Sequence, residues 1–242
     1  MSVDKSDARI RQMFGRIATR YDRLNHLLSL NIDRYWRWRT VRAVPPRGDA
    51  PILDLCTGTG DLALVYYRKG ANGAPIVGAD FCHEMLVLGR DKGRRAGADG
   101  RLVFVEADAQ RLPFPDAYFQ IVAVAFGLRN ICDPDRALAE MVRVLRPGGR
   151  LAVLEFSLPT FRPLRALYGW YFQRVLPRIG RMFAGRGAEA YEYLPNSVVE
   201  FTADTSLAER MGHAGLAEVR VRSLTMGVVN LWIGTKPKQV TP

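Results

Sequence analysis

From residue 51 onward, short apolar runs alternate with stretches in which apolar residues recur every three or four positions. The apolar runs are bounded by Gly, Pro or Asp, which is typical of buried strands. They predict seven strands, near residues 51–56, 76–80, 102–107, 119–126, 149–156, 216–223 and 227–236. This alternation favours an α/β fold: a doubly wound, mostly parallel sheet with helices on both faces and an antiparallel hairpin at one edge.

The clearest helix is predicted from Pro134 to Leu145, because its apolar residues fall on one face. Asp133 is a suitable N-cap, and Pro134 suits the first turn. Pro147-Gly148-Gly149 is the expected stop signal. A further helix is expected to start near Asp204, before the last two strands.

The composition is that of a soluble globular protein, with 242 residues of which 48% are hydrophobic and 24% charged. No apolar stretch approaches the roughly 18–20 residues needed to span a membrane. The first twelve residues lack the apolar core of a signal peptide, and the three cysteines are scattered. We therefore expect a cytoplasmic protein without disulfides.

Positive charge is concentrated in two segments. Lys and Arg number 35 against 24 Asp and Glu, a net charge of +11. Residues 8–48 carry +8 and residues 156–188 carry +6, which leaves −3 for the rest of the chain. Both segments also have an apolar helical stripe, so they suit an anionic membrane surface, or they pack on the protein's own core.

A glycine-rich turn follows the first predicted strand. Gly58, Gly60 and Ala63 match the G-x-G-x-x-G/A pattern, and Asp80 ends the second strand. Such a turn lets the backbone approach a ligand closely, and a later carboxylate accepts hydrogen bonds from ribose hydroxyls. The pattern predicts a nucleoside cofactor, with a purely structural glycine turn as the alternative.

The choice between NAD and S-adenosylmethionine depends on nearby acids. Asp54 and Asp61 would repel a pyrophosphate but suit a cofactor that carries an ammonium and a sulfonium. S-adenosylmethionine is therefore the expected cofactor. Asp108, after the third strand, would accept a hydrogen bond from the adenine amino group, or it serves only as a turn cap.

Four stretches of the chain carry a specific resemblance, which covers nearly all of its length. The chain resembles the class I S-adenosylmethionine methyltransferases, which have a Rossmann-like fold. Within them it is similar to the ubiquinone/menaquinone biosynthesis C-methyltransferase family, which contains the demethylmenaquinone methyltransferases. The stretches are Tyr21-Asp22-Arg23-Leu24-Asn25 with Ser29 and Trp36; Phe126-Gly127-Leu128-Arg129-Asn130; Arg143-Val144-Leu145-Arg146-Pro147-Gly148-Gly149 with Leu151, Leu154, Glu155 and Ser157; and Ala190-Tyr191-Glu192-Tyr193-Leu194-Pro195-Asn196-Ser197.

The resemblance implies cofactor contacts at Thr59, Asp80, Asp108 and Ala109. Together with the residue pattern, the expected cofactor site comprises Asp54, Gly58, Thr59, Gly60, Asp80, Asp108 and Ala109. The chain departs from the family pattern at Thr57, Leu24, Asp33 and Ala125. Ala125 stands where many members have a serine, so a side-chain hydrogen bond at the fourth strand is in doubt.

The implied substrate is a quinol with a polyprenyl tail, methylated on a ring carbon: demethylmenaquinol, or also the benzoquinol of the ubiquinone pathway. An ionised phenol activates its ortho carbon, and a cation stabilises that oxyanion. Arg129 is the expected cation and Asn130 its orienting partner. Alternatively, Arg129 pairs with a carboxylate and Asn130 caps a turn. His26, Tyr191 and Tyr193 are weaker candidates for a base, and no metal site is expected.

We expect one methyltransferase domain over residues 1–242, made of a helical segment (1–48), a cofactor-binding core (49–156), a helical cap insert (157–200) and a C-terminal helix with an edge hairpin (201–242). The basic helix at 163–176 is expected to contact an anionic membrane at the inner face of that membrane, and to cover the pocket.

A nucleic-acid partner is not expected, and a homodimer is left open. The rival functions are another lipophilic aromatic substrate, a nucleic-acid methyltransferase and a noncatalytic adaptor.

Overall fold

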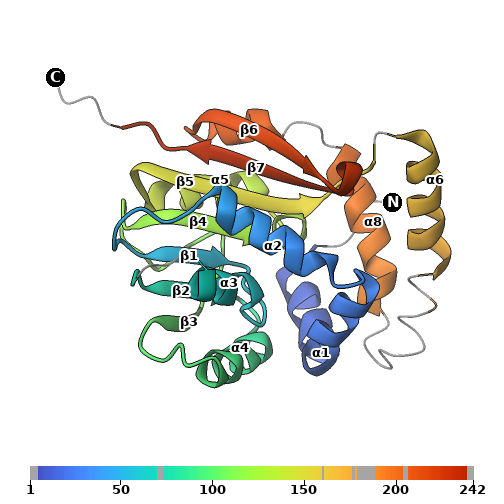
Figure 1. The fold of residues 1–242 in the computed structure, drawn as a ribbon, viewed down its shortest axis with the longest axis horizontal. Helices are drawn as coiled ribbons and strands as arrows, with labels where there is room; N and C mark the ends of the chain where they lie inside the picture. Colours follow the sequence, from blue (N-terminus) through green and yellow to red (C-terminus); the bar gives the residue numbers. More distant parts are fainter. Residues whose placement is uncertain are drawn as a thin grey trace.

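The computed structural model describes residues 5–69, 73–159, 161–175, 178, 189–203 and 207–238. A seven-stranded sheet forms the centre of the molecule, in the order β3-β2-β1-β4-β5-β7-β6 (Figure 1). The first five strands are parallel, and β7 runs antiparallel to both of its neighbours. This confirms the predicted fold. The strands are β1 (Ile52–Leu55), β2 (Ile76–Asp80), β3 (Leu102–Glu106), β4 (Phe119–Ala125), β5 (Leu145–Phe156), β6 (Ala217–Leu224) and β7 (Val229–Thr235).

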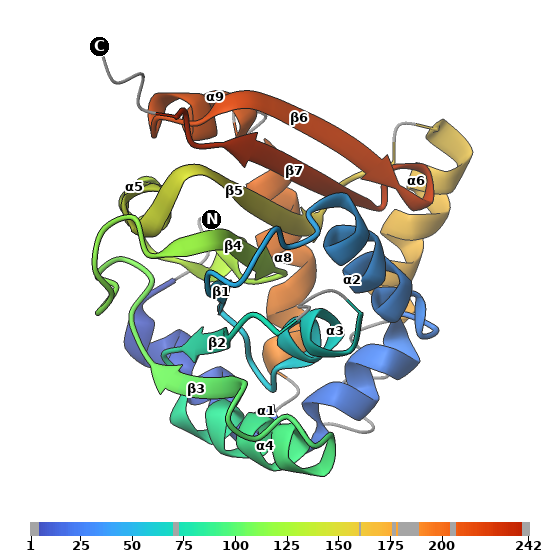
Figure 2. The same ribbon diagram turned by 60° about the vertical axis from the view of Figure 1, so that its left-hand side comes forward.

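Helices cover both faces of the sheet, because the inner strands are apolar on both sides (Figure 2). One face packs against α2, α3 and α4, and the other against α5 and α9. The helices are α1 (Asp7–Leu28), α2 (Ile32–Ala43), α3 (Asp61–Lys69), α4 (His83–Arg95), α5 (Pro134–Val144), α6 (Arg162–Trp170), α8 (Glu189–Ala203) and α9 (Leu207–His213), with short turns η1 (Leu128–Asn130), η2 (Tyr171–Val175) and η4 (Thr225–Gly227).

The predicted helix at 134–145 is present, and Asp133 caps it by accepting a 3.0 Å hydrogen bond from the backbone N–H of Arg136. The predicted stop signal is wrong. The helix ends at Val144, and Pro147-Gly148-Gly149 lies inside β5. Leu145 already pairs with Phe119 of β4, and an irregularity in that ladder accommodates the three residues. Asp204 lies outside the described residues, and α9 begins at Leu207.

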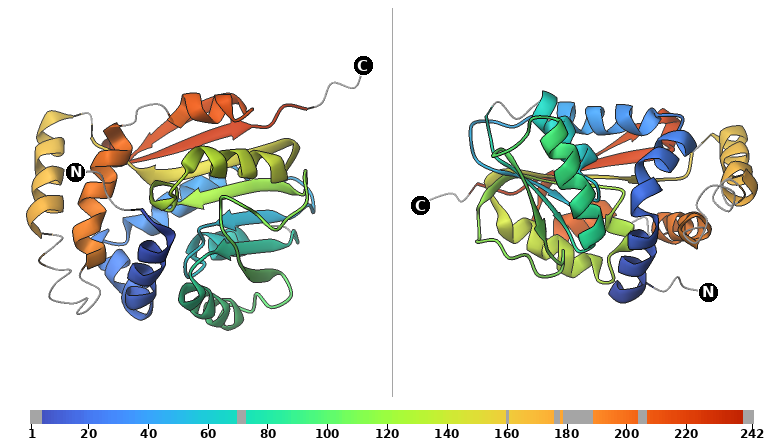
Figure 3. Two further views of the ribbon diagram at one scale, coloured as in Figure 1. Left: turned by 180° about the vertical axis from the view of Figure 1, so that it is seen from behind. Right: turned by 90° about the horizontal axis from the view of Figure 1, so that it is seen from below.

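Helices α1, α6 and α8 gather beyond the end of the sheet at which the parallel strands terminate (Figure 3). The apolar stripe of α1 does not face solvent: Ile10, Met13 and Ile17 are buried in a cluster with Met85 of α4 and Tyr193 of α8. In α6, by contrast, no residue is buried. The two helices therefore differ: α1 packs its apolar stripe on the core, whereas α6 leaves Leu167 and Trp170 exposed. None of the helices in the described part of the chain is long and apolar enough to cross a membrane.

Candidate active site

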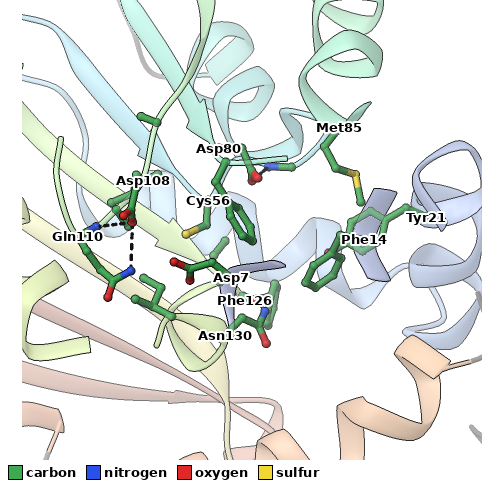
Figure 4. A pocket seen from close by; sticks show the side chains of 18 residues that line it. Asp7, Phe14, Tyr21, Cys56, Asp80, Met85, Asp108, Gln110, Phe126 and Asn130 are labelled. Atoms are coloured by element: carbon green, nitrogen blue, oxygen red, sulfur yellow. Dashed lines mark hydrogen bonds between the residues drawn. The ribbon is translucent and has the colours of Figure 1, made fainter. Parts of the chain in front are cut away.

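Two adjoining cavities lie at the carboxyl ends of the strands, where open α/β sheets bind ligands. We call the first the strand-end cleft (Figure 4). We call the second the apolar cavity; its volume is about 770 Å³. Phe14 and Tyr21 of α1 and Phe126 after β4 border both cavities. A ligand in one cavity therefore lies next to a ligand in the other.

The glycine loop forms one wall of the strand-end cleft. Gly58 has a φ of +56°, and a Cβ atom built on it would meet nothing within 4 Å. Its backbone N–H donates a 2.8 Å hydrogen bond to Asp80 Oδ2. Gly60 has a φ of +83° and packs so tightly under Phe104 that a Cβ atom would lie 2.7 Å from the ring. Gly58 thus keeps the cleft open, whereas Gly60 allows the loop to pack on β3.

Asp80 lies at the tip of β2 and borders the cleft. Its second oxygen accepts a 2.9 Å hydrogen bond from the backbone N–H of Cys82, so both oxygens are fixed by the backbone. Burial raises the pKa of the Asp80 carboxyl, and these backbone N–H groups oppose the rise. The carboxylate is rigidly aimed, as a hydrogen-bond acceptor for ribose hydroxyls must be.

Asp108 and Ala109 follow β3 and also line the cleft. Asp108 is exposed, and its Oδ1 accepts hydrogen bonds from the backbone N–H (2.8 Å) and side-chain amide (3.2 Å) of Gln110. The turn-cap role is therefore present. The same carboxylate faces the cleft (Figure 4), so it remains available to a second donor such as an adenine amino group.

The cleft is narrow because α1 crosses it. Side chains of Asp7, Phe14 and Tyr21 point into it (Figure 4), and the remaining space is about 70 Å³. Pockets that hold ligands of drug size measure roughly 300–1,000 Å³. The donor and acceptor groups of the cleft fit a nucleoside cofactor, but its entry requires these α1 side chains to move.

Three of the residues predicted to bind the cofactor, Asp54, Thr59 and Gly60, do not line the cleft. Asp54 is buried and accepts hydrogen bonds from Thr57 Oγ1 (2.5 Å) and the Ala63 N–H (2.9 Å). Thr59 is buried and donates to Asp22. Gly60 packs under Phe104. In this structure the three residues hold the loop in shape, and their contact with the cofactor stays a prediction.

The charge argument that favoured a cationic cofactor also needs correction. Asp61 pairs with Lys92 at 2.5 Å and lies 3.7 Å from Arg37, so its charge is already compensated. Burial raises the pKa of the Asp54 carboxyl to about 7, so this group is not a permanent negative charge at neutral pH. The two acids do not present free negative charge to the cleft.

The raised pKa of Asp54 predicts a pH-dependent stability. The ordinary value is 3.8, so the folded protein holds this proton more tightly than the unfolded chain. The resulting stabilisation is present below about pH 4 and is lost as the pH rises to about 7, a change of about 4 kcal/mol. Asp54→Asn is expected to flatten this part of the profile of unfolding free energy against pH, measured by denaturant titration. Asp99→Asn, at an exposed site, is the control; equal slopes in the two variants would contradict the assignment.

A partly buried polar network surrounds Asp61 and joins α1, α2, α3, α4 and the glycine loop. In the described part of the chain, one group of side chains has a spacing that suits a metal ion, namely His26, Asp33 and Asp61. However, Asp33 pairs with Arg37 at 2.5 Å, and Asp61 pairs with Lys92. These cations occupy the place of an ion, so we assign a structural role. His26 pairs with Asp33 at 2.8 Å and lines neither cavity, so it is not positioned as a base.

Arg129 lines the apolar cavity and is itself buried. Its Nη1 pairs with Glu155 at 2.6 Å and donates to the carbonyl of Phe126 at 2.5 Å. The guanidinium lies 5.4 Å from the centre of the Phe156 ring. Its Nε has no hydrogen-bond acceptor among the described residues. The carboxylate-paired alternative is therefore observed, and Arg129 also lines the apolar cavity.

Asn130 lines the strand-end cleft, and its Oδ1 accepts a 3.2 Å hydrogen bond from the Tyr193 hydroxyl. Burial raises the pKa of Tyr193 to about 12, so this phenol is a donor at neutral pH and not a base. Burial also raises the pKa of Tyr21, while Arg129 and Arg37 oppose the rise. The side chain of Tyr191 lies outside the described residues.

Comparison with known proteins identifies the family. A model of the ubiE/COQ5 methyltransferase family matches residues 2–236. The chain belongs to this family. It is 48% identical to the demethylmenaquinone methyltransferase of Thermus thermophilus over 225 residues, which cover 93% of this chain and all of that protein. It is 43% identical to a ubiquinone/menaquinone biosynthesis C-methyltransferase of Geobacter sulfurreducens over 228 residues, 94% of this chain and 88% of that one.

Among solved structures, an S-adenosylmethionine-dependent methyltransferase of Thermotoga maritima has a fold similar to that of this chain, with a TM-score of 0.65 and 20% sequence identity. The match covers 93% of this chain and 99% of that one. The predicted enzyme class and cofactor are confirmed: this ubiE/COQ5 family member is a methyltransferase that uses S-adenosylmethionine. The cofactor prediction was thus right although its charge argument was wrong.

Sequence reasoning missed the contributions of four residues to the site. The sequence pattern indicated no role for Asp7 or Phe14, and it gave Tyr21 only as part of a family stretch and of the apolar stripe of the first helix. Helical periodicity shows which face of α1 is apolar but not that this face crosses the cleft. Glu155 was quoted within a family stretch without a role, although a buried acid at a strand end signals a charged partner.

Proposed function

We propose that this methyltransferase transfers a methyl group to a ring carbon of a quinol with a polyprenyl tail, and that demethylmenaquinol is its substrate. The observation that carries the proposal is the apolar cavity beside the strand-end cleft, with the cationic side chain of Arg129 in its wall. Relatives named for menaquinone or ubiquinone/menaquinone biosynthesis support the choice of ring.

The two cavities receive different parts of the reaction. In the strand-end cleft, Gly58, Asp80, Asp108 and Ala109 hold the cofactor. When bound, S-adenosylmethionine supplies an electrophilic methyl group and leaves as S-adenosylhomocysteine. The quinol ring occupies the apolar cavity near Phe126, which borders both spaces, and the tail extends along the apolar side chains of α2 and α6.

Arg129 stabilises the ionised quinol hydroxyl through the positive charge of its guanidinium, which lowers the pKa of that hydroxyl and makes the ortho carbon nucleophilic. Glu155 holds the guanidinium in place through Nη1. Asn130 is held by Tyr193 at the boundary of the cleft and orients the ring. Tyr21, which borders both cavities, excludes water from the space between donor and acceptor.

A product analysis tests the function. The protein is incubated with methyl-labelled S-adenosylmethionine and reduced demethylmenaquinone, beside a benzoquinol analogue, and the label is located by mass spectrometry. We expect label on a ring carbon of the naphthoquinol. Label on oxygen, or on neither ring, would overturn the proposal, and label on the benzoquinol would extend the substrate range.

The role of Asp80 is tested by calorimetry with S-adenosylmethionine. Asp80→Ala removes a fixed charged acceptor and frees the N–H of Gly58, so we expect a roughly hundredfold weaker affinity. Asp116→Ala, at an exposed carboxylate away from both cavities, serves as the control. Equal affinity in Asp80→Ala and the unchanged protein would show that the cofactor site is wrongly placed.

The proposal includes contact of the basic helix at 163–176 with an anionic membrane surface at the inner face of the membrane. Its support is that α6 has no buried residue and carries Arg162 and Arg165 beside exposed Leu167 and Trp170. We also infer that nucleic acid is not a substrate, because the arginine of the site faces an apolar space.

A further inference from the structure

Five large apolar side chains are exposed to solvent and also line the apolar cavity, so they form its mouth. Leu27 lies at the end of α1, Leu30 in the turn that follows and Ile32 at the start of α2, and their exposed fractions are 53%, 78% and 36%. Leu167 and Trp170 of α6 stand opposite, exposed by 59% and 52%. The α1–α2 turn and α6 lie at the same end of the molecule in Figures 1 and 2. We call these five side chains the rim.

Tyr35 and Trp38 extend the rim along the outer face of α2. They are 42% and 36% exposed, and neither lines the cavity. Their rings lie 6.0 Å apart. Contiguous exposed apolar surface of this kind marks an interaction site. Tyr and Trp in particular favour the interface between water and lipid, since each has an apolar body and a polar group.

The backbone at the tip of the α1–α2 turn is held in a conformation that its residues disfavour. Leu30 and Asn31 have φ values of +51° and +61°. Asn tolerates this left-handed region, but Leu does not. The protein therefore keeps the most exposed large apolar side chain of the rim at a position where Gly or Asn would suit the backbone better. Strain that persists at such a position indicates a function for the side chain.

Positive charge surrounds the same surface. The guanidinium of Arg42 lies 5.3 Å from the centre of the Trp38 ring, and Arg39 donates a 2.7 Å hydrogen bond to the Tyr35 hydroxyl. Arg34 is exposed on the same helix, whose acid Asp33 is buried. The outer face of α2 therefore presents apolar side chains and cations together, a combination that suits anionic lipid headgroups over a hydrocarbon interior.

We propose that the rim, with Tyr35 and Trp38, docks on the surface of an anionic lipid bilayer, so that the mouth of the apolar cavity opens directly against the membrane. Leu30 and its neighbours insert below the headgroups, and Arg34, Arg39 and Arg42 contact the phosphates. This inference rests on the proposed function, because a polyprenyl tail then passes from the bilayer into the cavity without crossing water. This proposal makes the α1–α2 turn the principal docking element, in addition to the basic helix at 163–176.

A bilayer fits this surface better than a second copy of the chain. Residues 8–48 carry a charge of +8, so two copies meeting through this face would bring like charges together. An anionic membrane offers both the opposite charge and an apolar phase for Leu27, Leu30 and Trp170.

Vesicle flotation with the full chain tests the proposal. The vesicles contain phosphatidylcholine with or without phosphatidylglycerol. We expect binding that requires the anionic lipid and that falls by about tenfold or more in the double variant Tyr35→Gln/Trp38→Gln. Its turnover of a short-chain, water-soluble quinol analogue is expected to stay unchanged, because neither side chain lines a cavity, while turnover of long-tailed quinol in vesicles falls with binding.

A matched control removes exposed apolar side chains elsewhere. Val103→Gln/Val221→Gln changes residues that are 48% and 47% exposed on the two edge strands, and it is expected to bind vesicles like the unchanged protein. Leu30→Asn provides a second test, because Asn suits the left-handed backbone. We expect this variant to be at least as stable as the unchanged protein yet to bind vesicles more weakly, an outcome that a merely structural role of Leu30 would not give.

The inference would be overturned if the protein did not bind vesicles or bound them without anionic lipid. It would also be overturned if Tyr35→Gln/Trp38→Gln and the control variant bound vesicles equally. A dimer in sedimentation experiments that this double variant dissociates, without vesicle binding, would assign the rim to self-association instead. Binding is measured without substrate. Vesicle binding therefore tests the docking surface even if the product analysis shows that the quinol is not the substrate. Conversely, methylation of the soluble analogue without vesicle binding would reject the docking surface and leave the proposed function intact.

Discussion

Replacing Arg129 with methionine is expected to lower turnover by about 10²- to 10³-fold, because the ionised quinol hydroxyl then lacks its stabilising cation. Binding of S-adenosylmethionine should change little, since Arg129 does not line the strand-end cleft. The single variant also leaves Glu155 buried and unpaired, which costs about 3–5 kcal/mol of unfolding free energy. Turnover at saturating substrate and denaturant unfolding are both measured.

The double variant Arg129→Met/Glu155→Gln separates the two effects. It removes both charges of the buried pair, so most of the unfolding free energy should return. If Arg129 acts on the quinol, turnover stays low in the stable double variant. Recovery of turnover together with stability would show that the pair is only structural, and the catalytic assignment of Arg129 would fail.

Gly60→Ala is expected to lower the unfolding free energy by about 3 kcal/mol or more. The new Cβ atom would meet two carbons of the Phe104 ring at 2.7 and 2.8 Å, and the φ of +83° disfavours any side chain. Thermal and denaturant unfolding measure the loss. Adding Phe104→Leu should restore part of it; no restoration would contradict the proposed clash.

Gly58→Ala is the matched comparison. Its φ of +56° lies in the left-handed region, and nothing lies within 4 Å of the added Cβ atom, so the cost in unfolding free energy is about 1 kcal/mol. The Cβ atom would instead project into the cleft, so affinity for S-adenosylmethionine should fall more than stability. If Gly58→Ala lost more unfolding free energy than Gly60→Ala, the assignment of Gly58 to the cleft and of Gly60 to the contact with Phe104 would be wrong.

The architecture was predictable because the sequence pattern of each strand and helix is local, within a few residues of chain. A parallel strand covered on both faces consists of a nearly continuous apolar run, and all four residues of β1 and all five of β2 are buried. The alternation of strands and helices then leaves few topologies, because crossovers are right-handed. The end of α5 was less predictable, since Pro147-Gly148-Gly149 is compatible with a helix stop as well as with an irregular strand.

The functional site was predictable only in part. The position of Gly58, Asp80, Asp108 and Ala109 on one cleft was predictable because strand ends converge on one edge of the sheet. Asp54, like Asp80, is an acid near the end of a strand, yet its side chain accepts hydrogen bonds from Thr57 and the Ala63 N–H and does not line the cleft. A pattern of residue types does not distinguish a carboxylate that faces a ligand from one that supports the backbone.

The sequence by itself therefore determined the sheet, the glycine turn, the position of Arg129 after β4 and the two basic amphipathic segments. Only the tertiary structure decided that α1 crosses the strand-end cleft, that Arg129 meets Glu155 across 26 residues, and that the α1–α2 turn and α6 frame one apolar mouth. The physical reason is that secondary structure follows from periodicity within a few turns of chain. The partner of a buried charge and the covering of an apolar face depend instead on which distant segments pack together.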